Sequence, residues 1–303
     1  MKKYLIIGGA GFIGSHLSEA LLKQSNRVVV IDTMPFEFTG VKAYKIDIRD
    51  YKKIGGVFKK ERPDVVFHLA GAINLRREIT DPLFLKDVDF LSRTKIILDV
   101  CKKYNVKKII FISSGGAIYE NAQKIPTAEG YEAHPASLYG LANLLTEKYI
   151  VLYCQRHGVG FSIPRLSNAY GPRQWQSGFI PSVIAKLLKK EKPVMYGAGN
   201  QTRDFVYIDD AIEALILLAQ KGKNSIYNVG SGKETSLKEV LGLIKKYLGS
   251  KSKLSYENAR GPETQRSALD IKKIKKELGW IPKTSMEQGV AKTIDWFRAH
   301  GRY

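Results

Sequence analysis

Three glycines near the N-terminus have the spacing of a phosphate-binding turn. Gly8, Gly11 and Gly14 recur at every third position, in the order G-x-x-G-x-x-G. In such a turn the first glycine permits a tight bend, the second lets the backbone approach a pyrophosphate, and the third lets a helix pack closely on a sheet. A helix that begins near Phe12 and Ile13 would direct its amide dipoles at the same pyrophosphate. These residues predict a dinucleotide site.

An acidic residue further along the chain indicates which dinucleotide fits. Asp32 directly follows the apolar run 28–31. A carboxylate at the end of a strand can accept hydrogen bonds from a ribose diol, and it repels a 2′-phosphate. We therefore expect NAD as the cofactor rather than NADP.

Further residues with suitable chemistry stand where other apolar runs end. Asp47 and Ile48 follow one run, where a carboxylate can bind the adenine amino group while Ile48 packs nearby. A second run closes on Leu69-Ala70-Gly71. Small residues there let the backbone run beside the phosphates and ribose of the cofactor.

Strand-length apolar runs alternate with helical patterns over the first half of the chain. Strands are expected at 4–7, 28–31, 42–46, 64–69, 106–113, 161–166 and 226–229. This alternation predicts an α/β fold of the Rossmann type, a doubly wound parallel sheet with right-handed crossovers. Ligands bind such sheets at the carboxyl ends of the strands, where Asp32, Asp47, Gly71 and Ser113 are all expected.

The alternation loosens after residue 166. We expect a NAD-binding domain over residues 1–166, to which the chain returns around 205–229, and a smaller C-terminal lobe for substrate over most of 167–303. The expected helices include 81–104, 136–157, 179–190, 236–248, 270–278 and 285–299.

The composition restricts the classes of partner. The chain has 303 residues, 44% of them hydrophobic, which is enough for a large core. It contains no run of about 18 apolar residues, so no membrane span is expected. The net charge is +20, but the lysines come in pairs scattered over many predicted helices. Such pairs are typical of solvated helix faces, so we expect an anionic small-molecule substrate rather than a nucleic acid.

The possible metal ligands lack the spacing of a metal site. Cys101 and Cys154 lie in helical patterns, and His68 stands alone in the middle of a strand. We expect two buried thiols, a packed histidine, no metal and a reducing cytoplasmic location.

Several motifs occur in a fixed order over nearly the whole chain. They are GGAGFIGS from Gly8, Asp47-Ile48, HLAG from His68, SSGGAIY from Ser113, RLSNAYGP from Arg165, RDFVYIDD from Arg203 and LGWIP from Leu278. Together they resemble the extended short-chain dehydrogenase/reductase family, in particular its NAD-dependent nucleotide-sugar epimerases and dehydratases of the UDP-glucose 4-epimerase-like kind.

The resemblance implies a chemistry and roles for matched residues. The family transfers a hydride from a sugar C–H to tightly held NAD, giving a keto sugar, and Tyr139 matches its tyrosine base. Asn168 matches the asparagine that meets the sugar diphosphate of a nucleotide sugar, usually a UDP-sugar. Arg203 and Arg260 match the arginines that clamp the phosphates, a task that suits the guanidinium fork. The family also implies a homodimer through the helices expected at 81–104 and 136–157.

The sequence departs from the family at three places. Asn143 stands where the family has the lysine of Tyr-x-x-x-Lys, a cation that lowers the pKa of the tyrosine. Gly115 stands where an assisting Ser or Thr is usual, with Ser113 and Ser114 beside it as possible sources of that hydroxyl. Residues 90–94 read FLSRT where the family tends to have Asn-Val-x-Gly-Thr.

The sequence leaves alternative functions open. The leading hypothesis is an NAD-dependent nucleotide-sugar epimerase or dehydratase with Tyr139 as base, and within it a UDP-sugar 4-epimerase. The alternatives are a UDP-sugar dehydratase, a protein that binds NAD and a nucleotide sugar with little turnover, and a reductase of a free keto sugar.

Overall fold

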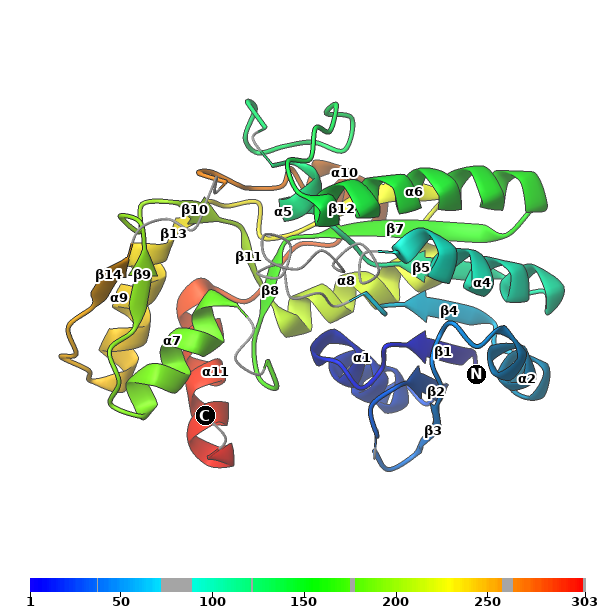
Figure 1. The fold of residues 1–303 in the computed structure, drawn as a ribbon, viewed down its shortest axis with the longest axis horizontal. Coiled ribbons are helices and arrows are strands. Elements are labelled where there is room, and N and C mark those ends of the chain that lie inside the picture. Colours follow the sequence, from blue (N-terminus) through cyan, green and yellow to red (C-terminus); the bar gives the residue numbers. More distant parts are fainter. Residues whose placement is uncertain (37, 72–88, 121, 175–177, 258–263, 302–303) are drawn as a thin grey trace.

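A parallel sheet forms the centre of the larger part of the molecule (Figure 1). The computed structural model describes residues 1–36, 38–71, 89–120, 122–174, 178–257 and 264–301. Within them eight strands form this sheet in the order β12-β7-β5-β4-β1-β2-β3, with β6 pairing β7 beyond the end of β5. The strands are β1 (Lys3–Ile7), β2 (Arg27–Asp32), β3 (Val41–Lys45), β4 (Val65–His68), β5 (Lys108–Phe111), β6 (Ser113–Ser114), β7 (Gly160–Leu166) and β12 (Ser225–Val229). The predicted doubly wound α/β fold is confirmed.

Two hydrophobic cores follow from the alternation of side chains along the strands. Tyr4 and Ile6 of β1 face one side of the sheet and Leu5 and Ile7 the other, all almost fully buried. The first side is covered by α1 (Phe12–Lys23) and α8 (Ile208–Lys221). The second side is covered by α2 (Tyr51–Glu61), α4 (Phe90–Lys103) and α6 (Leu138–His157). A sheet with helices on both faces has its polar openings at the strand ends.

Some expected elements have different bounds in the structure. The described part of the helix expected at 81–104 is α4, which begins at Phe90 behind the N-cap Asp89, and residues 81–88 lie outside the described residues. The strand expected at 106–113 is divided at Ile112, whose N–H donates to the carbonyl of His68.

A smaller lobe is built mainly from the C-terminal half, on the left in Figure 1. Its helices α7 (Phe179–Leu188), α9 (Leu237–Leu248) and α11 (Met286–His300) pack on one another. Two short sheets complete it, β9 (Val194–Tyr196) with β14 (Ser255–Glu257) and β10 (Thr202–Arg203) with β13 (Thr235–Ser236). The chain returns to the main sheet as β12, with α10 (Lys272–Leu278) against it. A domain boundary at residue 166 stays a prediction.

A short parallel pair joins the two parts. Strand β8 (Asn168–Tyr170) runs directly on from β7 and pairs with β11 (Phe205–Tyr207). Asp204, which is fully buried, accepts hydrogen bonds from the N–H groups of Ser231, Gly232 and Leu269 at 2.6–3.1 Å. This carboxylate therefore fixes two segments of the chain, one at Ser231-Gly232 and one at Leu269, beside the start of β11.

The remaining sequence expectations concern single side chains. Cys101 and Cys154 are buried free thiols, as expected. His68 is a packed core residue, also as expected, and its Nε2 lies 3.0 Å from Thr94 Oγ1. None of the helices that the structure describes combines the length and apolarity needed to cross a bilayer.

Candidate active site

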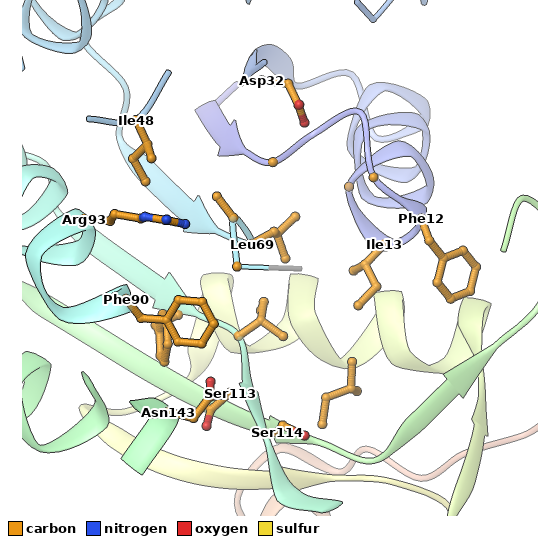
Figure 2. Close-up of a pocket in the computed structure, with 18 of the residues that line it drawn as sticks. Phe12, Ile13, Asp32, Ile48, Leu69, Phe90, Arg93, Ser113, Ser114 and Asn143 are labelled. Carbon is orange, nitrogen blue, oxygen red and sulfur yellow. The ribbon is translucent and has the colours of Figure 1, made fainter. Parts of the chain in front are cut away.

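A cavity of about 820 Å³ opens at the carboxyl ends of the central strands (Figure 2). Its volume lies within the usual range of ligand pockets. The residues predicted to bind the cofactor all line it: Gly8, Gly11, Phe12, Ile13, Gly14, Asp32, Asp47, Ile48, Leu69, Ala70, Gly71 and Tyr139. The fold thus brings together residues that are far apart in the sequence.

The glycine turn leaves no room for side chains at two of its positions. Gly8 has φ +84°, and a Cβ there would lie 2.9 Å from the backbone nitrogen of Ala70. A Cβ at Gly14 would lie 2.5 Å from the carbonyl oxygen of Gly8. Gly11 is the N-cap of α1, so the first N–H groups of that helix open on the cavity. A turn of this kind suits an approaching pyrophosphate.

Two carboxylates also line the cavity, with Asp32 beside the glycine turn. Asp32 accepts hydrogen bonds from the backbone N–H groups of Ala10 and Met34, both at 2.9 Å, which fixes its orientation at the end of β2. Arg49 donates two hydrogen bonds to the Asp47 carboxylate, from Nε to Oδ1 at 3.0 Å and from Nη2 to Oδ2 at 2.6 Å. The hydrogen bond from Arg49 lowers the pKa of Asp47 to about 2, so Asp47 is an anion at neutral pH.

Tyr139 and the two serines meet at the other end of the cavity. Ser113 and Ser114 form β6, and alternation along a strand turns their side chains in opposite directions. The side chain of Ser114 acts on Tyr139 and opposes the rise of its pKa that burial causes. Ser113 is 3% exposed, and its Oγ has no hydrogen-bond partner among the described residues. Of the two serines between which the sequence left the choice open, Ser114 is thus the one that interacts with Tyr139.

Asn143 lies one helical turn after Tyr139 on the buried face of α6. It is 2% exposed, and its Nδ2 donates to the carbonyl oxygen of Tyr139 at 2.9 Å. Burial raises the pKa of Tyr139, while hydrogen bonds with Asn143 and Ser114 oppose the rise. Lys148 is exposed, so it supplies no charge to this buried face. Tyr139 accordingly stays protonated at neutral pH.

Phe90 and Gly115, two positions at which the sequence departs from the family, make apolar contacts in the structure. The ring of Phe90 stands edge-on to that of Tyr139, with ring centroids 5.9 Å apart, and packs against Gly71. A Cβ at Gly115 would lie 2.8 Å from the side chain of Leu269, so a serine or threonine would require that leucine to move.

The predicted substrate residues are distributed differently. Asn168 lines the cavity from β8. Arg203 is not among the described residues lining the cavity, and its Nη1 donates to the carbonyls of Thr202 and Thr264 at 2.8 and 2.7 Å. Arg260 lies outside the described residues.

Sequence reasoning missed several polar residues of the cavity, and among the described residues two of them have unsatisfied buried oxygens. Ser167 and Gln174 line it, and Ser167 Oγ and Gln174 Oε1 are buried atoms without a hydrogen-bond partner among the described residues. Ser167 lies within the RLSNAYGP motif, directly beyond the end of β7, and Gln174 lies two residues after the motif, which was the available signal. Buried polar groups are rarely left unsatisfied in proteins, so these oxygens, like Ser113 Oγ, fit a bound polar molecule such as NAD.

A buried ion pair stands behind the catalytic face of α6. Arg165 of β7 donates to the Glu147 carboxylate through Nε at 3.0 Å and Nη2 at 2.6 Å, and both residues are almost fully buried. Arg165 also contacts the hydroxyl of Tyr119. Because Glu147 follows Asn143 by one helical turn, the pair fixes α6 against the sheet at the level of the site.

A second cavity of about 490 Å³ lies in the smaller lobe. Phe179, Lys186, Lys189 and Tyr196 are among its lining residues. The two cavities are neighbours. Gly178 lines the second cavity and Gln174 lines the first, and a Cβ on Gly178 would lie 3.3 Å from Nε2 of Gln174.

The chain is similar to proteins of a known family and to solved structures. Residues 4–230 match the model of the family described as "NAD dependent epimerase/dehydratase family". A putative UDP-glucose 4-epimerase of Methanocaldococcus jannaschii is 38% identical over 98% of this chain and 99% of its own. The crystal structure of UDP-glucose 4-epimerase with UDP-glucose from Thermotoga maritima matches with a TM-score of 0.93 at 34% identity, over 98% of this chain and 99% of that one. The Thermus thermophilus UDP-glucose 4-epimerase complex with NAD matches with a TM-score of 0.91 at 30% identity, over 98% and 99% of the two chains.

Proposed function

The chain belongs to the NAD-dependent epimerase/dehydratase family, and from that premise we propose that it is a UDP-sugar 4-epimerase acting through a transient 4-keto sugar. The observation that carries the proposal is the composition of the cavity. Residues suited to NAD occupy one part of it, and Tyr139, Ser114 and Asn168 stand together at the other. NAD, the cofactor of this family, supplies a hydride acceptor and donor when bound.

The residues of this chain would hold the cofactor and move the proton. The glycine turn and the start of α1 would hold the pyrophosphate, and Asp32 would bind the adenosine ribose. Tyr139 would take the proton of the sugar hydroxyl and return it, with Ser114 linking the two groups by hydrogen bonds. Asn143 would position Tyr139 through its backbone carbonyl and offer an uncharged amide to a ribose.

The acidic residues favour an epimerase over a dehydratase. Elimination of water requires an acid that protonates the departing hydroxyl. Among the described residues, Asp32 and Asp47 are the carboxylates that line the cavity, and both stand at the adenosine end. Gly115 and Gly116, which begin the short helix α5 (Gly115–Ile118) directly after Ser114, carry no acid.

The second cavity supports a nucleotide substrate. The rings of Phe179 and Tyr196 offer stacking surfaces for a base, and Lys186 and Lys189 offer positive charge for phosphates. A UDP-sugar that spans both cavities would place its sugar by Asn168 and its nucleotide in the smaller lobe. UDP-glucose bound to the Thermotoga maritima relative supports this class of substrate.

We further propose that the protein is a homodimer through α6. Leu138, Leu145 and Leu152 repeat at seven-residue intervals and are 38%, 50% and 64% exposed. Such a repeat places them along one side of a helix, where a second copy would bury them. Replacing Leu145 and Leu152 by glutamate should yield a monomer in sedimentation velocity at unchanged thermal stability of the fold.

One specific observation favours a second candidate function. The raised pKa of Tyr139 and the absence of a charge at Asn143 fit a protein that binds NAD and a UDP-sugar but turns over slowly.

A panel of UDP-sugars followed by NMR tests these functions. The panel is UDP-glucose, UDP-galactose, UDP-N-acetylglucosamine and UDP-glucuronic acid, each incubated with the protein and NAD, with binding of NAD and UDP measured by calorimetry. Inversion at C4 of one of these sugars is expected. A 4-keto-6-deoxy product would show a dehydratase, and tight binding without any turnover would show a binding protein.

A further inference from the structure

Arg93 places a positive charge inside the cofactor cavity. It belongs to the first turn of α4 and is one of the residues that line the cavity. Figure 2 shows its guanidinium between Ile48 and Phe90, extending across the cavity toward Leu69. From the sequence alone this residue belongs to a stretch, 90–94, noted only as unusual.

The helix turn that carries Arg93 is held firmly against the sheet. The next residue, Thr94, is fully buried and contacts His68 Nε2 at the end of β4, at 3.0 Å. Burial, with a smaller contribution from the charge of Arg93, lowers the pKa of His68 to about 4. The imidazole is therefore neutral at pH 7 and adds no cation of its own.

The described lining of the cavity carries charges of both signs. Among its described lining residues the cations are Arg49 and Arg93, and the anions are Asp32 and Asp47. Arg49 forms a bidentate pair with Asp47. A dinucleotide brings two phosphate charges into the same space, and the start of α1 meets them from the opposite wall through backbone N–H groups alone.

We propose that Arg93 is a cofactor-binding residue of this chain, which forms a charge-assisted contact with the phosphate of the adenosine half of NAD. The guanidinium lies beside Ile48, where the adenine is expected, and on the wall facing the glycine turn. The phosphate is then held from two sides, by helix N–H groups and by an arginine. This inference rests on the NAD site and not on the sugar reaction.

Calorimetric titration tests the contact separately from catalysis. The full chain, freed of bound nucleotide, is titrated with NAD, ADP-ribose, AMP and adenosine, as the parent and as Arg93→Gln and Arg93→Lys. We expect Arg93→Gln to weaken binding of NAD, ADP-ribose and AMP about tenfold or more, which is typical of the loss of a charge-assisted hydrogen bond, and to leave adenosine unchanged. Arg93→Lys should retain part of the affinity, because it keeps the charge without the fork.

Lys95→Gln is the matched control. Lys95 lies two residues further along α4, loses the same charge when changed, and pairs with Asp99 on the exposed side of the helix. It should bind all four ligands like the parent, and thermal unfolding of each variant verifies the fold. Unchanged NAD affinity in a folded Arg93→Gln protein would overturn the proposal. An equal loss for adenosine would overturn it too, because the arginine would then contact the base and not the phosphate.

Discussion

Replacing Asn143 by lysine should increase the rate of turnover at neutral pH. Tyr139 is the proposed base, and burial holds its pKa above the usual value of 10. At pH 7 the tyrosinate fraction is then below about 10⁻³. The parent should turn over slowly, and its rate should rise with pH.

The size of the gain follows from the position of residue 143. Its side chain starts one helical turn from Tyr139, on the same buried face. An opposite charge at close range commonly shifts a pKa by about 1–3 units, so the tyrosinate fraction at pH 7 should rise about 10- to 1000-fold. We expect a gain in kcat of at least about tenfold, with the pH profile moved toward lower pH.

Glu147 does not cancel the new charge. Its carboxylate lies one turn further on and is already engaged by Arg165 through Nε and Nη2 at 3.0 and 2.6 Å. The lysine ammonium would therefore remain available to Tyr139 and to a ribose hydroxyl.

The assay is the interconversion of UDP-glucose and UDP-galactose across pH 6 to 10, followed by NMR. Asn143→Met is the control, because methionine approaches lysine in length without its charge, so that the difference between the two variants isolates electrostatics. Tyr139→Phe should abolish turnover in the parent and in Asn143→Lys. Two results would refute the reasoning: fast turnover by the parent at pH 7 with no pH dependence, or no gain by a folded, NAD-binding Asn143→Lys protein over Asn143→Met.

Three other perturbations address binding and stability. Arg203→Ala should weaken binding of a UDP-sugar about tenfold or more and leave NAD binding intact, as measured by calorimetry; equal affinity would exclude this arginine from the phosphate site. Glu147→Gln should lower the free energy of unfolding by about 3–5 kcal/mol in urea titrations, because it leaves the buried charge of Arg165 without its partner. Hydrogen bonds from Lys23 and Arg173 lower the pKa of Glu19 to about 2, so the carboxylate should stabilise the protein fully above about pH 4.5 and lose that effect as the pH falls toward 2. The stability difference between the parent and Glu19→Gln should follow the same window, and a difference that does not change between pH 6 and 3 would contradict it.

Most of the main sheet could be predicted because its central strands are buried on both faces, whereas the edge strand β3 is largely exposed. Runs such as residues 4–7 and 28–31 are continuously apolar, and each ends on a glycine or an acid that cannot extend the run. The paired strands β8 and β11 were not predicted, because a strand of three residues is too short to show an alternation of apolar and polar side chains. Their pairing depends on the fully buried Asp204, whose three backbone partners come from distant loops.

The site was predictable where the chemistry belongs to a motif, and less so where it depends on packing. The glycine turn and Asp32 are local patterns and lie where the sequence places them. The choice between Ser113 and Ser114 depends on which face of β6 is turned toward Tyr139. The residues of a two-residue strand do not by themselves determine this orientation. Ser167 and Gln174 look like ordinary loop residues in the sequence, and only the folded structure brings their oxygens into the cavity.

The unusual residues of the cavity fall into two groups with opposite electrostatic effects. Near Tyr139, Phe90 provides an apolar ring and burial raises the pKa of the tyrosine, a rise that the neutral amide of Asn143 opposes through a hydrogen bond and not through a charge. At the adenosine end, Arg93 adds a cation beside the pair formed by Arg49 and Asp47. A positive charge placed there would strengthen the hold on the phosphates without lowering the pKa of the base. The distribution of charge along the cavity thus favours tight binding of the dinucleotide over fast proton transfer. For this reason the affinity for NAD and the pH dependence of turnover have to be measured separately.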